Sequence, residues 1–368
     1  MATYLFKRLL LIFPTLFGIM LISFAIIQFA PGGPVERMIA QLTGTDNGAT
    51  SQISGGGGDG LSGTATASGA ADISSKYRGA QGLDPEFIKE LEQQFGFDKP
   101  AYERFILMMG NYLTLNFGNS YYRDTPVLSL IWEKLPVSVS LGVCLLLLTY
   151  TLSIPLGIRK AVQDGEPFDT WTSGVLVVGY ALPGFMVGVF LLVLFAGGSF
   201  WQWFPTRGLT SDDYEQLSII GKIADRAWHL TLPLIALAIG SFTQLTFLTK
   251  NSFIDEIRKQ YVLTARSKGL NERQILYGHV FRNAMLIVIA GFPAAFIFAF
   301  FTGSLLIETI FSLDGIGLLG YESIINRDYP VVFATLFIFS LLGMVVQLIS
   351  DFVYTLVDPR IDFESREV

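Results

Sequence analysis

The chain has 368 residues, of which 51% are apolar and only 15% are charged, and its net charge at pH 7 is -6. Soluble domains carry about 25% charged residues, so this composition excludes an ordinary soluble enzyme and a disordered chain. The acidic balance argues against a nucleic-acid partner. A single cysteine excludes a disulfide framework, and together with only two histidines it makes a metal centre unexpected. The composition predicts an integral membrane protein.

Six stretches contain no Asp, Glu, Lys or Arg and are long enough to cross a bilayer, which requires about 20 apolar residues. They lack the short alternating pattern of a transmembrane barrel. The chain is therefore predicted to be an all-α polytopic membrane protein with six transmembrane helices. The third stretch is too long for one straight helix, and its aromatic tail is typical of a membrane interface. The stretches are residues 9–35, 135–158, 170–206, 227–249, 283–307 and 329–350.

Lys and Arg in the loops predict the orientation of the chain. The two short loops at 198–228 and 308–330 hold four basic residues, whereas the four segments on the opposite side hold 13. The long loop after the first helix holds eight, but long loops have little influence on orientation. We therefore expect both termini in the cytoplasm. The basic segments are 1–8, 159–170, 250–283 and 358–368.

This topology divides the chain into four parts. Residues 1–31 form a first helix that is retained, because its apolar run is too long for a signal-peptide core and no cleavage signal follows it. Residues 32–134 form an outer loop, residues 135–357 the remaining membrane core, and residues 358–368 a cytoplasmic tail.

The outer loop contains two kinds of sequence. Residues 43–82 are rich in Gly, Ser, Thr and Ala, which predicts a flexible insert because such a segment buries little apolar surface. Residues 83–116 are expected to form a small helical cap outside the membrane, with Pro85 opening one helix and Pro100 another. In the second helix, Tyr102, Ile106, Met109 and Leu113 form the expected apolar stripe. The cap either only packs on the membrane helices or also serves as a docking platform.

Motifs for catalysis are absent from the sequence. There is no G-x-x-x-x-G-K-[ST] loop, so the chain is not expected to hydrolyse ATP, and there is no H-E-x-x-H or G-x-S-x-G motif. His229 and His279 are interpreted as structural residues. The sequence therefore predicts neither a catalytic residue, nor a cofactor site, nor a metal ligand.

The centres of the predicted helices carry essentially no ionisable residues, which weakens the case for a proton-coupled transporter. Glu308 and Asp351 lie near helix ends and are interpreted as satisfied interfacial residues. Uncharged polar residues within the spans are better candidates for a water-filled path or for helix contacts. As weak candidates for the substrate path we take Gln244, Thr246 and Gln347.

The segment 250–283 is the most informative loop, because it holds seven basic residues. Ala265 and Gly269 are four apart, so a helix would place both small residues on one face, open to close approach by another chain. Gly269 also predicts the end of a helix, followed by a turn and a second helix. Such a knob indicates a docking element; the alternative is a basic amphipathic helix that lies on anionic lipid.

The motif YVLTARSKGL at 261–270, followed by Arg282, Asn283 and Ala284, resembles the EAA loop of bacterial ABC-importer permeases. It is most similar to the B-type permease of the dipeptide and oligopeptide importers. Leu263 stands where the general motif has Glu, and peptide-type members often lack that Glu. In this family the loop forms a coupling helix that sits in a groove of the ATPase. The resemblance implies that role for Tyr261, Leu263, Thr264, Ala265, Arg266, Ser267, Lys268, Gly269 and Leu270.

Further motifs along the chain resemble the same family. They are FAPGGP at 29–34, FGFDKP at 95–100, ETIFS at 308–312 with GIG at 315–317, NRDYP at 326–330 and VDPRI at 357–361. The glycine-rich insert and the ending DPRIDF at 358–363 are similar to the Yej-type subfamily, which imports oligopeptides and the peptide-nucleotide antibiotic microcin C.

The resemblance implies a type I ABC-importer permease fold in a bacterial inner membrane. It also implies three partners: a homologous C-type permease, a cytoplasmic ATPase that binds ATP and Mg²⁺, and a periplasmic peptide-binding protein. Transport would proceed by alternating access, and this chain would hold no cofactor of its own. Two alternatives remain at this stage. A secondary transporter or channel would need ionisable residues in the helix centres, and a membrane enzyme would need a catalytic constellation.

Overall fold

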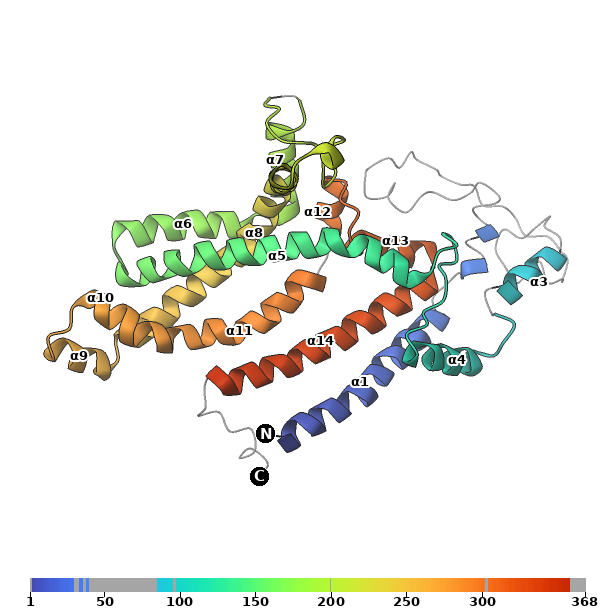
Figure 1. The fold of residues 1–368 in the computed structure, drawn as a ribbon, viewed down its shortest axis with the longest axis horizontal. Coiled ribbons are helices and arrows are strands. Elements are labelled where there is room, and N and C mark those ends of the chain that lie inside the picture. Colours follow the sequence, from blue (N-terminus) through green and yellow to red (C-terminus); the bar gives the residue numbers. More distant parts are fainter. Residues whose placement is uncertain are drawn as a thin grey trace, which may run out of the picture. The chain divides into compact units, whose positions relative to one another are not determined.

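The computed structural model describes residues 2–29, 33–35, 38–39, 85–94, 97–198, 200–301 and 304–357. Throughout these ranges the regular structure is helical and no strand occurs (Figure 1). The predicted insert at 43–82 and the tail at 358–368 lie outside the described residues. The chain divides into two compact units. One comprises Met1–Arg8, Lys134–Leu318 and Gly343–Val368, and the other comprises Leu9–Glu133 and Leu319–Leu342.

Five described helical runs are long and apolar enough to cross a membrane. They are Phe6–Phe29 in α1 (Ala2–Phe29), α5 (Val127–Val162), α8 (Ile219–Ile257), Glu272–Phe296, which enters α11 (Phe281–Phe301), and Tyr329–Val353 in α14 (Tyr329–Val357). A sixth candidate is the bent pair of α6 (Pro167–Ala181) and α7 (Gly184–Phe195). The six predicted spans therefore correspond to five single candidates and one bent pair, and the predicted all-α membrane fold is confirmed.

The bend between α6 and α7 explains why the third apolar stretch is too long for one helix. The two helices meet at 95°. Leu182 takes an extended conformation, with φ -86° and ψ 127°, because the residue before a proline is disfavoured in the helical region. Pro183 cannot donate the backbone hydrogen bond that would continue α6. The break therefore lies in the middle of the stretch, far from its aromatic tail.

In the first unit, α5 and α6 lie next to each other and α8 crosses α5 obliquely (Figure 1). α5 and α8 approach closely at Gly157, where a Cβ atom would lie 2.8 Å from the Thr246 carbonyl oxygen and 2.6 Å from the Thr249 Cβ. No larger side chain fits there without moving one of the helices. Ser153, one turn earlier, donates a hydrogen bond to the Phe242 carbonyl oxygen at 3.1 Å. These contacts hold α5 against α8.

In the second unit, α3 (Pro85–Gln94) and α4 (Ala101–Leu113) form the predicted helical pair. α4 buries Phe105 and Tyr112, whose rings contact Phe24 of α1 at 5.3 Å and Phe337 of α14 at 5.4 Å between centroids. The predicted apolar stripe is wrong, because Tyr102, Ile106 and Leu113 are mostly exposed. The buried face of α4 lies one residue before the predicted stripe. The sequence does not distinguish the two faces, because α4 carries apolar residues on both.

The isolated ionisable and histidine residues are packed within the chain. Glu308 lies on α12 (Leu305–Ile310) and is fully buried, and its carboxylate accepts a hydrogen bond from the Leu318 N–H of α13 (Ile316–Asn326) at 2.7 Å. Asp351 is buried in α14 and pairs with Arg8. His229 is buried inside α8, with its Nδ1 2.9 Å from the Asp225 carbonyl oxygen.

Candidate functional site

The 250–283 segment folds as a compact helical knob between α8 and α11. α9 (Gln260–Ser267) follows the end of α8, and a short turn leads to α10 (Glu272–Ile275). A π-helical turn, η3 (Leu276–Val280), then leads into α11. The predicted order of helix, turn and second helix is confirmed. π-helical turns inside longer helices occur frequently at functional sites.

The turn depends on two residues. Gly269 has φ +83°, a left-handed conformation that glycine adopts at little cost. Asn271 then starts α10 with a capping box: its side chain accepts from the Gln274 N–H at 2.8 Å, and the Gln274 side chain accepts from the Asn271 N–H at 3.1 Å. Both orphan donors are thereby satisfied. The turn is thus specified locally by its own residues.

One side of α9 faces the interior of the chain. Val262 and Ala265 are buried in a cluster with Phe253 of α8 and with Ile275 and Val280 beyond the turn. The prediction that Ala265 and Gly269 share an open face is therefore wrong. α9 ends before Gly269, and Ala265 is small because it packs against its own chain.

The other side of α9 is exposed. Its apolar centre is Leu263, with 57% of its surface accessible. The Arg266 guanidinium forms a bidentate ion pair with the Glu272 carboxylate, with N–O distances of 2.8 and 3.0 Å. Tyr261 is half-buried and donates to Glu256 at 2.8 Å; burial is the main factor that raises the pKa of its hydroxyl. The exposed residues are Leu263, Thr264, Arg266, Ser267, Lys268 and Gly269. This set, which we call the α9 outer face, could seat in a partner groove that offers an apolar pocket and polar rims.

A cavity of about 360 Å³ lies beside the α9 outer face. Its walls are mostly apolar, and the Arg266–Glu272 pair lies among its lining residues. The main lining residues are Val162, Val262, Ile275, Leu276, Tyr277 and Val280. The cavity therefore joins the end of α5 to both helices of the knob.

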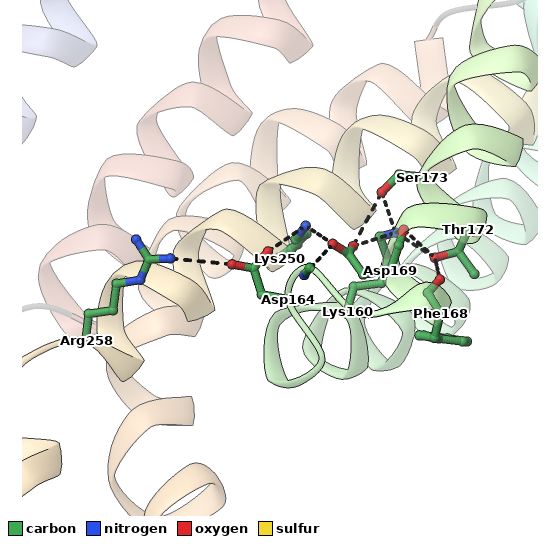
Figure 2. A network of polar contacts seen from close by, with 9 residues as sticks. Lys160, Asp164, Phe168, Asp169, Thr172, Ser173, Lys250 and Arg258 are labelled. Carbon is green, nitrogen blue, oxygen red and sulfur yellow. Dashed lines mark hydrogen bonds and ion pairs between the residues drawn. The ribbon is translucent and has the colours of Figure 1, made fainter.

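A buried ion network ties the knob to the long helices (Figure 2). The Lys160 ammonium on α5 has no accessible surface and lies 3.0 Å from the Asp169 carboxylate of α6. It also donates to Thr172, Ser173 and the Asp169 carbonyl oxygen at 2.7–2.9 Å. A buried ammonium needs this many acceptors because its hydration shell is gone.

The network continues to α8 and to the start of the knob. Lys250 lies 2.6 Å from Asp169 and 3.0 Å from Asp164, and Arg258 at the end of α8 lies 3.4 Å from Asp164. Asp169 therefore joins two lysines from two helices, and Asp164 joins α8 to the α5–α6 turn (Figure 2). Because α9 follows the end of α8, a movement of α9 would reach α5 and α6 mainly through Lys250, since Arg258 is largely exposed and its pair is long.

The three candidate path residues have different surroundings. Gln244 is exposed on α8, and its side-chain amide donates to the Tyr180 hydroxyl at 3.1 Å. Thr246 is fully buried where α8 meets α5. Gln347 is exposed on α14. Of the three, Gln244 and Gln347 present polar atoms on the surface of the chain.

Comparison with known families decides the class of the protein. Residues 153–363, more than half of the chain, match the family described as "Binding-protein-dependent transport system inner membrane component". The chain belongs to this family. It is thus a permease component of a binding-protein-dependent importer, and the matched region includes the whole ion network and the α9 outer face.

Curated relatives align with the permease over its full length. The "Peptidoglycan transport system permease protein YejB" of Agrobacterium fabrum is 64% identical over 100% of both chains. The "Inner membrane ABC transporter permease protein YejB" of Escherichia coli O157:H7 is 54% identical, again over 100% of both chains. The "Oligopeptide transport system permease protein AppB" of Bacillus subtilis is 32% identical over 99% of this chain and 100% of its own. The resemblance to ABC-importer permeases and to the Yej-type subfamily is confirmed.

The sequence reasoning missed the ion network. A signal was present: the apolar stretches end at charges of opposite sign, with Asp169 directly before the third stretch and Lys250 directly after the fourth. Lys160 lies in a predicted cytoplasmic segment with other loop cations, although it follows the second stretch by only two positions. Charges at the ends of antiparallel neighbouring spans lie at similar depth, so they can pair.

Proposed function

We propose that this permease imports peptides into a bacterial cell as one of two permease subunits of an ATP-driven transporter. The names of its relatives support a peptide substrate, since AppB belongs to an oligopeptide system and both YejB relatives cover the full chain. Oligopeptides are the main substrate class, with microcin C as a specific member. Peptidoglycan fragments, named for the Agrobacterium relative, fit the same class where they carry peptide stems.

The proposal includes three partners. A homologous C-type permease completes the translocation path, a cytoplasmic ATPase binds ATP and Mg²⁺, and a periplasmic binding protein delivers the peptide. The family description supports the last of these, because it names binding-protein-dependent transport. This chain itself carries no ATP site in the proposal, in agreement with its lack of a Walker A motif.

The proposed orientation places both termini and the knob in the cytoplasm. The excess of Lys and Arg in the segments on that side supports it. In a Cys144→Ser background, a cysteine introduced at Ser62 should react with a membrane-impermeant thiol reagent in intact spheroplasts. A cysteine at Ser267 should react only after the membrane is opened. The reverse pattern would refute both the orientation and the coupling role.

The α9 outer face is the proposed docking surface for the ATPase. The observation that carries this proposal is the exposed Leu263, on a helix whose opposite side is anchored in the chain by Val262 and Ala265. A large apolar residue held outward on a rigid element fits a partner pocket. The ion network then gives the path by which ATPase closure reaches α5, α6 and α8, and alternating access follows from that movement.

Reconstitution tests the proposal. The permease is incorporated into proteoliposomes with its C-type partner, the ATPase and the binding protein, and uptake of a labelled oligopeptide is measured with and without ATP. We expect uptake that requires ATP and the binding protein and that unlabelled microcin C inhibits. Uptake driven by a proton gradient without ATP would support a secondary transporter instead and would refute the proposal.

A further inference from the structure

An exposed polar pair lies on the long helices of the first unit. Gln244 of α8 donates its side-chain amide to the hydroxyl of Tyr180 on α6 at 3.1 Å. Both residues are exposed, Tyr180 with 51% of its surface accessible. α8 is a candidate membrane span, and α6 is the first half of the bent α6–α7 pair, which is a candidate only as a whole.

The depth of this pair follows from helix geometry. Lys250 and Asp169 are ion-paired and mark one polar end of α8 and α6. Gln244 precedes Lys250 by six residues, and Tyr180 follows Asp169 by eleven. At a rise of 1.5 Å per residue, Gln244 lies about 9 Å and Tyr180 about 16 Å along its helix from the ion-paired end. Half of a hydrocarbon core of about 30 Å is about 15 Å. The two values place the pair about 9 to 16 Å from that polar end, within the hydrocarbon core.

Polar atoms at this depth need partners. The hydrogen bond between the two side chains uses one N–H of Gln244 and one lone pair of Tyr180. Among the described residues, the Gln244 Oε1 and the Tyr180 O–H form no further hydrogen bond. Exposed to lipid, these groups would lose hydrogen bonds that water or protein would supply. Their surroundings in the assembled transporter must therefore be polar.

The break between α6 and α7 lies beside the pair. Leu182, two residues after Tyr180, is extended and half-exposed, and Pro183 contributes no N–H. Non-helical backbone at membrane depth is tolerated only where protein covers it or where it lines a water-filled cavity. Gly184, just after the break, lies against the Ala236 carbonyl oxygen of α8, so the chain covers one side of the break. The side-chain pair thus points to a polar space, and the break lies beside it.

We propose that Tyr180 and Gln244, together with the α6–α7 break, form a contact site for the peptide backbone in the translocation path. The inference rests on the proposed peptide-import function. The site offers an O–H donor, an N–H donor and a carbonyl acceptor, all neutral. This set matches the N–H and C=O of a peptide unit and ignores side-chain charge, so it suits substrates that differ in sequence but share a backbone.

The test uses two variants that remove hydrogen bonding with little change in volume, Tyr180→Phe and Gln244→Leu. Uptake of a labelled tripeptide and of its backbone N-methylated analogue is measured in the reconstituted complex with the same binding protein. Because one hydrogen bond is removed in each case, we expect the KM for the unmethylated peptide to rise about threefold to tenfold. The preference for that peptide over the methylated one should fall, while the amount of ATPase that copurifies stays unchanged.

Thr231→Val is the matched control. It also removes a hydroxyl from α8, but that hydroxyl donates within the helix to the Ala227 carbonyl oxygen at 2.7 Å, so uptake should not change. Unchanged KM and unchanged discrimination in both test variants would overturn the inference. Loss of the C-type partner from the purified complex would also overturn it, because the pair would then be a helix contact. If wild-type vesicles import no peptide at all, the proposed function fails first.

Discussion

The Lys160 ammonium lies 3.0 Å from the Asp169 carboxylate, and the Lys160 side chain has no accessible surface. The pair joins the last turn of α5 to the first turn of α6. A buried ion pair contributes little net stability, yet removal of one partner is costly because the other charge stays buried. The main consequence of this pair is therefore that α5 and α6 have one fixed arrangement at the end that carries the knob.

Replacement of Lys160 by Met should destabilise the permease. The expected loss is about 3 kcal/mol, at the low end of the range for a broken buried pair, because Lys250 still neutralises Asp169. Thermal unfolding of the detergent-purified protein measures it. Lys160→Met combined with Asp169→Asn should recover part of the loss, since the Asp169 oxygen that faces Lys160 then no longer belongs to a buried carboxylate that only Lys250 neutralises. Full stability of the single variant would mean that the ammonium is not buried as described.

Replacement of Lys250 by Gln should impair coupling more than folding. Lys250 joins α8 to both Asp164 and Asp169, whereas the Lys160 contacts that join α5 to α6 remain intact. We expect peptide uptake to fall about tenfold, as for the loss of charge-assisted bonds, while the ATPase still copurifies. Arg258→Gln is the control, because Arg258 is largely exposed and its pair with Asp164 is long at 3.4 Å. Equal uptake for Lys250→Gln and the wild type would remove α8 from the coupling path.

Substitutions at Gly269 separate backbone strain from docking. Apart from its two chain neighbours, no atom of the described chain lies within 4 Å of where a Cβ of residue 269 would be, so only its φ of +83° restricts the residue. Asn and Asp tolerate this conformation and have nearly the same shape. We expect both variants to fold, with Gly269→Asp losing more bound ATPase than Gly269→Asn because the charge enters the contact. Copurification of the ATPase measures this, and equal retention in both variants would mean that Gly269 lies outside the docking surface.

Glu308 should make stability depend on pH. Burial is the main factor that raises the pKa of its carboxyl, and hydrogen bonds from the Leu318 and Gly317 N–H groups oppose it. Because the folded-state pKa is higher than the unfolded one, the folded state binds the proton more tightly. This contribution therefore falls as pH rises from about 4.5, the ordinary value for Glu, through the folded pKa.

Glu308→Gln keeps an acceptor for the α13 N–H groups and cannot ionise. The variant should be more stable than the wild type at neutral pH, and the difference should shrink as pH falls toward about 4.5. Thermal unfolding across this range measures it. A difference that stays constant with pH would show that Glu308 is not ionised on going to neutral pH.

The sequence predicts the membrane spans well because each needs a long run of residues without charges, and such a run can be read directly from consecutive residues. It also predicts the turn of the knob, since Gly269 and Asn271 specify it locally. The orientation of α9 is not predictable in the same way. Val262 and Ala265 are buried by Phe253, Ile275 and Val280 from other elements, and spacing alone does not reveal which face those elements cover.

The ion network was missed for the same physical reason. Lys160, Asp169 and Lys250 are separated by up to 90 positions and meet only because α5, α6 and α8 pack together. A loop charge and a buried paired charge look alike in a sequence. The bend at Pro183 was only partly predicted: the length of the stretch showed that a break must occur, and the proline shows where.

A photo-cross-linking amino acid at position 263 shows whether the α9 outer face binds the ATPase. The complete transporter, carrying this residue in place of Leu263, is irradiated in membranes, and the products are identified by mass spectrometry. The same photo-cross-linking amino acid is also placed at position 277, because Tyr277 is exposed beside the cavity. A cross-link from there shows whether the contact with the ATPase extends to the cavity. We predict a cross-link from position 263 to the ATPase subunit. A cross-link to lipid alone, in a complex that still contains the ATPase, would show that α9 does not dock on the ATPase.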